Sequence, residues 1–419
     1  MKDHAEVVII GAGIMGLAIA YHLARRGVTD VVVLDKGYLC GGASGRNGGG
    51  VRAQWSSEAN IRLMLESIRM CQDFASEMKI NVWLRQGGYL FLTRTEDKRR
   101  ALEASVKLQS ECGLATRMLS PKEAQGIVPE LDIDGITAAS YNPDDGVVFP
   151  WPFVWGFAQG ARKLGVTVET FREVTGFRTK GSRIDGVVTR ALPRSGKGPA
   201  ARDEHIIRTH KVVNAAGAWS PEIARLLGVE LPNRPHRHEI CSTEPLKPWL
   251  KPLVADLTDG LYFSQSTRGE IVGGVGQEHV PHGINQDSSH AFLGRYARSL
   301  VRTCPILGHV KVLRQWSGCY DITPDANPIV GDVDEVENFY QASGFMGHGF
   351  MMAPIMGKLI AEYIIDRAAN ANRPGVSKVG RARGGEGAPP SVVDQNMFER
   401  WNLRRFREGK LLSEAMIIG

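Results

Sequence analysis

The first 35 residues combine two short, fully apolar runs with one longer helical pattern. Val7 to Ile10 and Val31 to Leu34 are uninterrupted aliphatic runs, which are typical of strands buried on both faces. Between them, a glycine-rich turn leads into an apolar stretch with helical spacing, from about Gly13 to Arg26. The pattern predicts a strand, a tight turn, a helix, and a second strand that ends at Asp35.

The glycines of this turn have the spacing of a dinucleotide-binding site. Gly11 permits the turn, Gly13 lets the backbone approach a pyrophosphate, and Gly16 allows close packing of the helix against the strand. Asp35 follows roughly twenty residues later, where its carboxylate can accept hydrogen bonds from ribose hydroxyls. A glycine turn without a ligand is the alternative. The position of the turn between a strand and a helix, with the acid in register, favours the dinucleotide.

The rest of the chain alternates between helical and strand-like patterns. Helical spacing occurs at 57–79, 96–112 and 151–164, and strand-like runs at 86–93, 166–169, 174–179, 184–189, 238–243, 260–265 and 270–275. We expect an α/β (α+β) fold, in which a Rossmann-like domain carries an inserted, mainly antiparallel substrate domain. The expected divisions are 1–85, 145–231 and 314–369 for nucleotide binding, 86–144 and 232–313 for the substrate, 370–395 as a flexible linker, and 396–419 as a C-terminal tail with a helix at 396–406.

Charge and cysteine content bear on the class of protein. The net charge is +6, but the ten Lys/Arg and four Asp/Glu between Arg367 and Lys410 account for the whole excess. We interpret this excess as a solvated basic tail, with a partner-docking tail as the alternative, and expect no nucleic-acid binding. The six cysteines form no CxxC or Cys/His cluster, so we expect reduced thiols, no metal site and a cytoplasmic location. Because three glycines break the apolar run from Val7 to Ala24, we expect neither a signal peptide nor a membrane span.

Several longer motifs resemble those of one enzyme superfamily. They are the dinucleotide turn, GASGRNGGG (42–50), VVNAAGAWS (212–220) and GFMGHGF (344–350). Together they resemble the FAD-dependent amine oxidoreductases of the D-amino-acid oxidase superfamily, over nearly the whole chain. YFSQ (262–265), YDITPD (320–325) and LRRFREGKL (403–411) make it most similar to the β subunits of sarcosine oxidase and dye-linked L-proline dehydrogenase.

The resemblance implies FAD rather than NAD as the cofactor. In that superfamily the dinucleotide turn holds the ADP half, and the glycine-rich loops lie along the pyrophosphate and the flavin ring. The positions assigned to FAD in this way are Gly11, Gly13, Ile14, Met15, Gly16, Asp35, Lys36, Ser44, Arg46, Asn47, Gly48, Gly49, Val174, Ala216, Gly217, Trp219, Gly344, Gly347, His348, Gly349, Phe350 and Met351.

The resemblance also implies the reaction, in which a hydride passes from the carbon next to an amine to flavin N5 and leaves an imine that water hydrolyses. Arg52 matches an arginine that meets the substrate carboxylate, Tyr262 and Tyr320 match pocket positions around the amine, and His348 matches a histidine beside the flavin. A surface arginine and core tyrosines are the alternatives. We expect a small secondary amine or amino acid such as sarcosine, with L-proline, hydroxyproline or a D-amino acid as alternatives, and O2 or a partner subunit of a hetero-oligomer as electron acceptor.

Three departures from the family pattern refine these expectations. Met351 stands where monomeric sarcosine oxidases carry a carboxylate-binding lysine, which leaves room for a larger or more apolar amine. Gly318, next to Cys319, stands where those enzymes carry the cysteine that links FAD. No histidine occurs in Phe149 to Pro152, where heterotetrameric relatives link FMN. We therefore expect non-covalent FAD. A flavin-containing assembly or binding protein without turnover, and an NAD-dependent dehydrogenase, are the alternatives.

Overall fold

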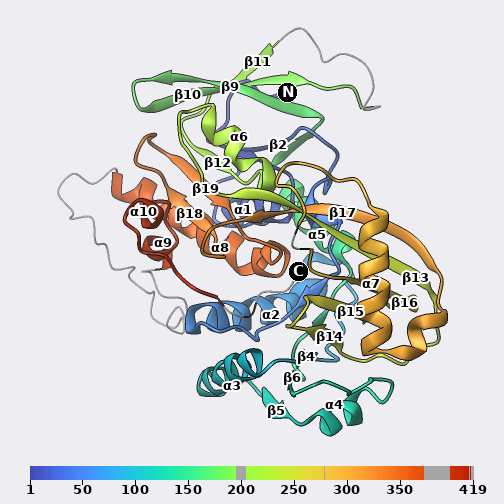
Figure 1. Ribbon diagram of the computed structural model, residues 1–419. Helices are drawn as coiled ribbons and strands as arrows, with labels where there is room; N and C mark the ends of the chain where they lie inside the picture. Colours follow the sequence, from blue (N-terminus) through green and yellow to red (C-terminus); the bar gives the residue numbers. More distant parts are fainter. Residues whose placement is uncertain (195–203, 278, 372–396, 415, 417–419) are drawn as a thin grey trace.

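The computed structural model describes residues 1–194, 204–277, 279–371, 397–414 and 416, in which two large β-sheets adjoin and helices pack around them (Figure 1). One sheet has six strands in the order β18-β19-β12-β1-β2-β8, and the other has eight in the order β17-β13-β16-β15-β14-β4-β6-β5. The strands of the second sheet come from two stretches of chain that interrupt the first sheet. This arrangement confirms the expected α/β fold with an inserted, mainly antiparallel sheet.

The six-stranded sheet contains the predicted dinucleotide unit. Its strands are β1 (Val7–Ile10), β2 (Val31–Asp35), β8 (Thr167–Thr170), β12 (Val212–Asn214), β18 (Ile329–Asp332) and β19 (Phe339–Ser343). All neighbours pair in parallel except β18 and β19. Val7 and Ile9 pack against the helices, whereas Val8 and Ile10 pack toward a three-stranded sheet on the opposite face. Because both faces are covered, the strands are apolar at every position.

Four helices cover one face of this sheet. They are α1 (Ile14–Arg25), α2 (Glu58–Met78), α5 (Pro150–Lys163) and α8 (Gly349–Ala371). α1 packs against α8 and α5, and a Cβ placed on Gly357 would lie only 2.5 Å from Ala18 Cβ, so a glycine is needed where the two helices cross. The opposite face carries β9 (Arg172–Lys180), β10 (Arg183–Ala191) and β11 (Glu204–Ile207), with α6 (Ser220–Arg225) beside them. The sheet is thus the middle of three layers.

The eight-stranded sheet forms the second lobe. Its strands are β4 (Tyr89–Thr93), β5 (Arg117–Leu119), β6 (Ala138–Asn142), β13 (Arg234–Pro245), β14 (Leu253–Asp256), β15 (Leu261–Gln265), β16 (Glu270–Gly274) and β17 (Val312–Ile322). Only β14 and β4 pair in parallel. The covering helices are α3 (Glu96–Glu111), α4 (Pro121–Ile127) and α7 (His290–Thr303), and the short strands β3 (Gly50–Val51) and β7 (Gly146–Val147) connect this lobe to the first. β17 extends this sheet past the domain boundary expected at residue 314.

The C-terminal part differs from the prediction. The expected linker lies outside the described residues from residue 372 on, and the single helix expected at 396–406 is two short ones, α9 (Met397–Arg400) and α10 (Arg404–Arg407). The interpretation as a solvated basic tail is wrong for Arg405, which is only 3% exposed and forms two hydrogen bonds with Asp325, at 2.7 and 2.9 Å, whereas Arg400, Arg404, Arg407 and Lys410 are exposed. Arg404 pairs with Asp334 at 2.6 Å. Acidic residues near β18 therefore neutralise part of the basic tail.

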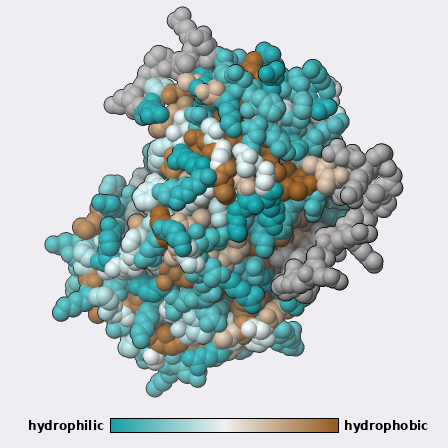
Figure 2. Space-filling view, turned by 180° about the vertical axis from the view of Figure 1, so that it is seen from behind, coloured by the Kyte–Doolittle hydropathy of each residue, from teal (hydrophilic) through white to brown (hydrophobic). Residues whose placement is uncertain are grey.

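The surface seen from behind is largely hydrophilic, with a band of hydrophobic residues across its upper half (Figure 2). None of the helices in the described residues is both long enough and apolar enough to cross a bilayer. The six cysteines are all unpaired, and five of them are buried. Among the described residues, no group of three or more His, Cys, Asp or Glu side chains is arranged to hold a metal ion.

Candidate active site and its relatives

A cavity of about 780 Å³ lies between the two large sheets. It is lined by the carboxyl end of β1, the loop after β2, the start of α8, and residues of β13, β15 and β17. All the predicted site residues line it except two glycines. Gly16 has a packing role, since a Cβ there would lie 2.0 Å from the Gly11 carbonyl oxygen, and Gly344 lies behind the wall, where its amide donates to Asp321 at 2.6 Å.

The dinucleotide turn has the geometry that its glycines predict. Gly11 has φ of +113°, and a Cβ there would lie 2.3 Å from the Ala215 carbonyl oxygen. No side chain caps α1 at Gly13, although the Ser44 hydroxyl accepts from the Ile14 amide at 2.9 Å. The positive end of α1 therefore faces the cavity, which is the arrangement that holds phosphate groups at a helix N-terminus.

Asp35 lies at the end of β2 and has two structural contacts of its own. Its carboxylate accepts from the amides of Ala12 and Gly37, each at 2.8 Å, and burial raises the pKa of Asp35 despite these bonds. The same carboxylate lines the cavity. Asp35 therefore supports the turn as well as being placed to accept from a ligand.

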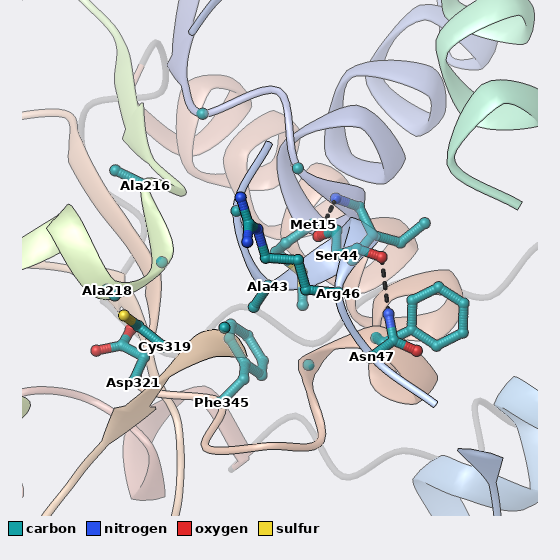
Figure 3. Close-up of a pocket in the computed structure, with 18 of the residues that line it drawn as sticks. Met15, Ala43, Ser44, Arg46, Asn47, Ala216, Ala218, Cys319, Asp321 and Phe345 are labelled. Atoms are coloured by element: carbon teal, nitrogen blue, oxygen red, sulfur yellow. Dashed lines mark hydrogen bonds between the residues drawn. The ribbon is translucent and has the colours of Figure 1, made fainter. Parts of the chain in front are cut away.

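The loop after β2 is held in place by its own polar side chains, as Figure 3 shows. Asn47 donates to the Ser44 carbonyl at 2.7 Å and accepts from the Gly49 amide at 2.8 Å. Arg46 donates to the carbonyls of Gly41, at 3.1 Å, and Ser317, at 2.9 Å. These bonds connect the loop to β17 and present its glycine backbone to the cavity as a flat wall.

On β17 the alternation of side chains separates Gly318 from Cys319. A Cβ on Gly318 would meet Arg46 and Ala43, whereas the Cys319 thiol donates to the Asn285 carbonyl at 3.4 Å. Burial raises the pKa of the Cys319 thiol, which makes it a poor nucleophile. Cys319 touches the cavity but its sulfur is engaged elsewhere.

At the other end of the cavity three rings form a stack. His238 lies near both Tyr262 and Tyr320, with ring centroids 5.7 and 4.5 Å away and interplanar angles of 17° and 11°. His238 Nε2 lies 3.0 Å from the Tyr262 hydroxyl. Burial lowers the pKa of His238 to about 3, so the ring is neutral and can accept from that hydroxyl. Both tyrosines were predicted from the sequence, but His238 was not, and its only signal is its place at the start of a strand-like run.

Arg52 and His348 form the polar floor beside this stack. Arg52 is 1% exposed, and its guanidinium lies over the rings of Trp55, at 4.2 Å, and Phe91, at 5.4 Å. Its Nη1 donates to the Gln54 carbonyl and its Nη2 to the Met416 carbonyl, and Nη2 also lies 3.2 Å from His348 Nε2. Among the described residues no carboxylate forms an ion pair with Arg52. Burial lowers the pKa of Arg52, and the charges of Glu414 and Asp145 oppose this shift only in part and without direct contact. A buried cation that is incompletely compensated favours the binding of an anion.

Two buried carboxyl groups flank the site and were not predicted. Asp145 accepts from the Ala53 amide at 2.7 Å and from Gln54 at 3.0 Å, so it fixes the residues next to Arg52. Asp321 accepts from Asn233 at 2.7 Å and lines the cavity. Burial raises the pKa of each to about 7.

The residues present fit an extended dinucleotide. The cavity lies within the ~300–1,000 Å³ typical of small-molecule and cofactor sites. Two helix N-termini, those of α1 and α8, face it, and glycine backbone forms the wall between them. Gly347 and His348 lead into α8, which begins at Gly349, and a Cβ on Gly347 would lie 2.5 Å from the Tyr320 ring. FAD carries a pyrophosphate and a flat ring, and both features match this wall.

Comparisons with known proteins agree with this geometry. The family model DAO, FAD dependent oxidoreductase, matches residues 6–363. The chain is 27% identical to sarcosine oxidase subunit beta of Rhodobacter capsulatus, over 100% of this chain and 92% of that protein, and 31% identical to FAD-dependent oxidoreductase domain-containing protein 1 of Mus musculus, over 87% and 82%.

Among solved structures, L-proline dehydrogenase from P. horikoshii superposes with a TM-score of 0.84 at 31% identity, covering 98% of this chain and 100% of that one. Glycine oxidase from Geobacillus kaustophilus superposes with a TM-score of 0.77 at 23% identity, covering 87% and 95%, which shows the shared fold. The match of the family model over most of the chain explains the dinucleotide turn, the glycine wall and the two helix N-termini together. The chain therefore belongs to the DAO family of FAD-dependent oxidoreductases.

Proposed function

We propose that the chain oxidises an α-amino acid with a secondary amine, of the size of proline or an N-alkyl amino acid. The observation that carries this proposal is Arg52, a buried guanidinium at the floor of the cavity with no carboxylate partner among the described residues. A substrate carboxylate would supply a counter-charge in direct contact with Arg52 through charge-assisted hydrogen bonds. The names of two relatives, sarcosine oxidase and L-proline dehydrogenase, both refer to carboxylated secondary amines and support this class.

FAD, held without a covalent bond, would accept the hydride from the carbon next to the amine, leaving an imine that water hydrolyses. Asp35 and the uncapped end of α1 would bind the ADP half. The α8 N-terminus, from Gly347 on, would aim its positive end at the ring. Gly318 in place of a linking cysteine, with the Cys319 thiol bonded to Asn285, supports non-covalent binding.

The chain's own residues would orient the substrate rather than act as a base that removes the proton of the substrate ammonium group. Arg52 would hold the carboxylate, and the stacked rings of Tyr262 and Tyr320 would pack around the amine. His238 and His348 are both neutral, because burial lowers the pKa of each, and Arg52 lowers that of His348 further. A neutral pocket beside a cation lowers the pKa of a bound ammonium group, which helps it to reach the reactive neutral form.

The pocket also indicates a substrate with some apolar bulk. Met351 is buried, its carbonyl accepts from the Ser67 hydroxyl at 2.6 Å, and it offers no second cation. Leu253 and Val272 add apolar wall near the tyrosines. Binding would therefore depend on one charge contact and on packing against a ring or alkyl group.

The electron acceptor is proposed from the relatives alone. Two further relatives are also named sarcosine oxidase subunit beta, of Arthrobacter sp. and Rhizobium meliloti, at 29% and 28% identity. A subunit name implies an assembly, so we propose that this chain passes electrons to a partner subunit of a hetero-oligomer, with O2 as the alternative acceptor.

An anaerobic titration of the purified yellow protein tests the substrate class. Proline, N-methylalanine and sarcosine are added in turn, with alanine and glycine as primary-amine controls. We expect the secondary amino acids to bleach the flavin absorbance, and proline to do so at lower concentration than sarcosine. Retention of the oxidised spectrum with every carboxylated amine would indicate a flavin-binding protein without this activity.

A further inference from the structure

The C-terminal segment, described at residues 410–414 and at Met416, reaches the floor of the candidate active site. The chain leaves α10 and runs towards α2 (Figure 1). Its path is fixed at the start by Asp325, which binds the buried Arg405 side chain and also accepts from the Leu412 amide at 3.2 Å. This buried ion pair connects the segment to the loop between β17 and β18.

Glu414 fixes the segment a second time, at the N-terminus of α2. Its carboxylate accepts from the Ser56 amide at 2.8 Å, from Asn60 at 2.9 Å, from the Ser57 hydroxyl at 3.2 Å and from the Ser56 hydroxyl. Ser57 makes no side-chain capping bond of its own. Glu414 therefore takes the place of a helix cap, and its negative charge lies at the positive end of the α2 dipole.

Glu414 also sets the position of Met416. Its Oε1 accepts from the Met416 amide at 3.1 Å, and the Met416 side chain is 1% exposed, packed in one cluster with Tyr89, Phe91 and Leu253. The Met416 carbonyl then accepts from Arg52 Nη2. One carboxylate thus orders a backbone oxygen that contacts the guanidinium at the floor of the cavity.

Two neutral carbonyls therefore hold Arg52, that of Gln54 within its own loop and that of Met416 from the C-terminal segment. The direct acceptors are neutral, so the charge of the guanidinium is compensated only in part, by the longer-range attraction of Glu414 and Asp145, and stays available to a ligand anion. We infer that Glu414 is a positioning residue for the substrate carboxylate and acts through Met416 on Arg52. This inference rests on the proposed function, because it assumes that Arg52 binds a carboxylate.

A pair of matched, unreactive ligands tests the inference on the FAD-loaded protein. Tetrahydrofuran-2-carboxylate has the shape of proline but no amine to oxidise, and tetrahydrofuran-2-carboxamide is its uncharged counterpart. Their dissociation constants are measured from the change in flavin absorbance, without turnover. The variants are Glu414→Gln and a chain that ends at Leu412. Glu408→Gln is the control, since Glu408 lies just before the segment, is exposed and pairs with the exposed Lys410.

We expect Glu414→Gln and the shortened chain to bind the carboxylate about tenfold more weakly, with little change for the amide, and Glu408→Gln to match the parent. Glu414→Asp should restore part of the carboxylate affinity. Unchanged carboxylate binding in both Glu414→Gln and the shortened chain would overturn the inference, as would an equal loss for both ligands. A parent protein that does not prefer the carboxylate over the amide would instead contradict the proposed function itself.

Discussion

Arg52 Nη2 lies 3.2 Å from His348 Nε2, and both side chains are buried at the start of α8. Burial lowers the pKa of His348 well below its usual value, and the neighbouring guanidinium lowers it further. Because Arg52 can only donate, His348 Nε2 accepts in this contact, and the ring is neutral. His348 is thus placed to orient Arg52 and the start of α8, and the substrate amine must lose its proton by another route.

The pH dependence of flavin reduction should reflect this neutral histidine. We expect the rate constant for reduction, divided by the substrate Kd, to rise from about pH 6 to about pH 10 as the substrate amine deprotonates. We expect no step near pH 6.5 from His348. His348→Asn should lower this ratio at every pH but keep the shape of its pH profile. A step near neutral pH in the parent that disappears in His348→Asn would show that His348 titrates.

A buried histidine away from the site predicts how stability depends on pH. Burial lowers the pKa of His22 in α1 to about 3, and the nearby Arg26 contributes. Between about pH 6.5 and pH 3, His22 therefore binds a proton in the unfolded chain but not in the folded chain. As a result, His22 lowers the free energy of unfolding as the pH falls below 6.5. Its cost at pH 5 is about 2 kcal/mol.

His22→Met should remove this cost. We expect the difference in Tm between His22→Met and the parent to grow in favour of the variant from pH 7 to pH 5, as measured by calorimetry. An unchanged difference across this range would mean that His22 is not buried as a neutral ring.

Asp35 should contribute to FAD affinity. Asp35→Ala removes an acceptor for the ribose hydroxyls and should weaken FAD binding by roughly 1.5–3 kcal/mol, about ten- to a hundredfold or slightly more. Because Asp35 also accepts from Ala12 and Gly37, Asp35→Asn serves as the comparison that keeps an acceptor for the turn. Substrate preference should change little. FAD bound as tightly by Asp35→Ala as by the parent would contradict the role of this carboxylate.

The flavin should separate completely from the polypeptide. Acid or heat precipitation of the yellow protein is expected to release all FAD into the supernatant, since Gly318 offers no linking atom and the Cys319 sulfur bonds to Asn285. Absorbance of the supernatant and pellet measures the distribution. Flavin that stays with the washed precipitate would demonstrate a covalent link.

The dinucleotide unit was predictable because its signals are local. The apolar run of β1, the glycine spacing and Asp35 all lie within 35 residues, and the structure has α1 and β2 within one residue of the predicted bounds. The contact between His238 and the tyrosines depends instead on which strands pair. β13 pairs with β17, which places His238 beside Tyr320. The sequence between these two strands does not indicate that register.

The burial of Arg405 could not be predicted for the same reason. The basic run was expected to be solvated throughout, but the partner of Arg405, Asp325, lies far away in the sequence. Burial of that pair depends on the β17–β18 loop meeting α10, which composition does not reveal. Glu414 contacts Ser56 across an even longer stretch of chain.

Rapid-reaction flavin reduction with a carboxylated amine and its decarboxylated analogue tests whether Arg52 binds the substrate carboxylate. Proline and pyrrolidine form such a pair, and the variants are Arg52→Gln and Arg52→Ala, with Arg69→Gln, an exposed position on α2, as the control. We predict that the parent strongly prefers proline, and that loss of Arg52 costs roughly 2–4 kcal/mol, about 30- to 1,000-fold, in the second-order rate constant for proline but not for pyrrolidine, with flavin content intact. Equal rates for proline and pyrrolidine in the parent, unaffected by Arg52→Gln, would contradict the binding of the substrate carboxylate by Arg52.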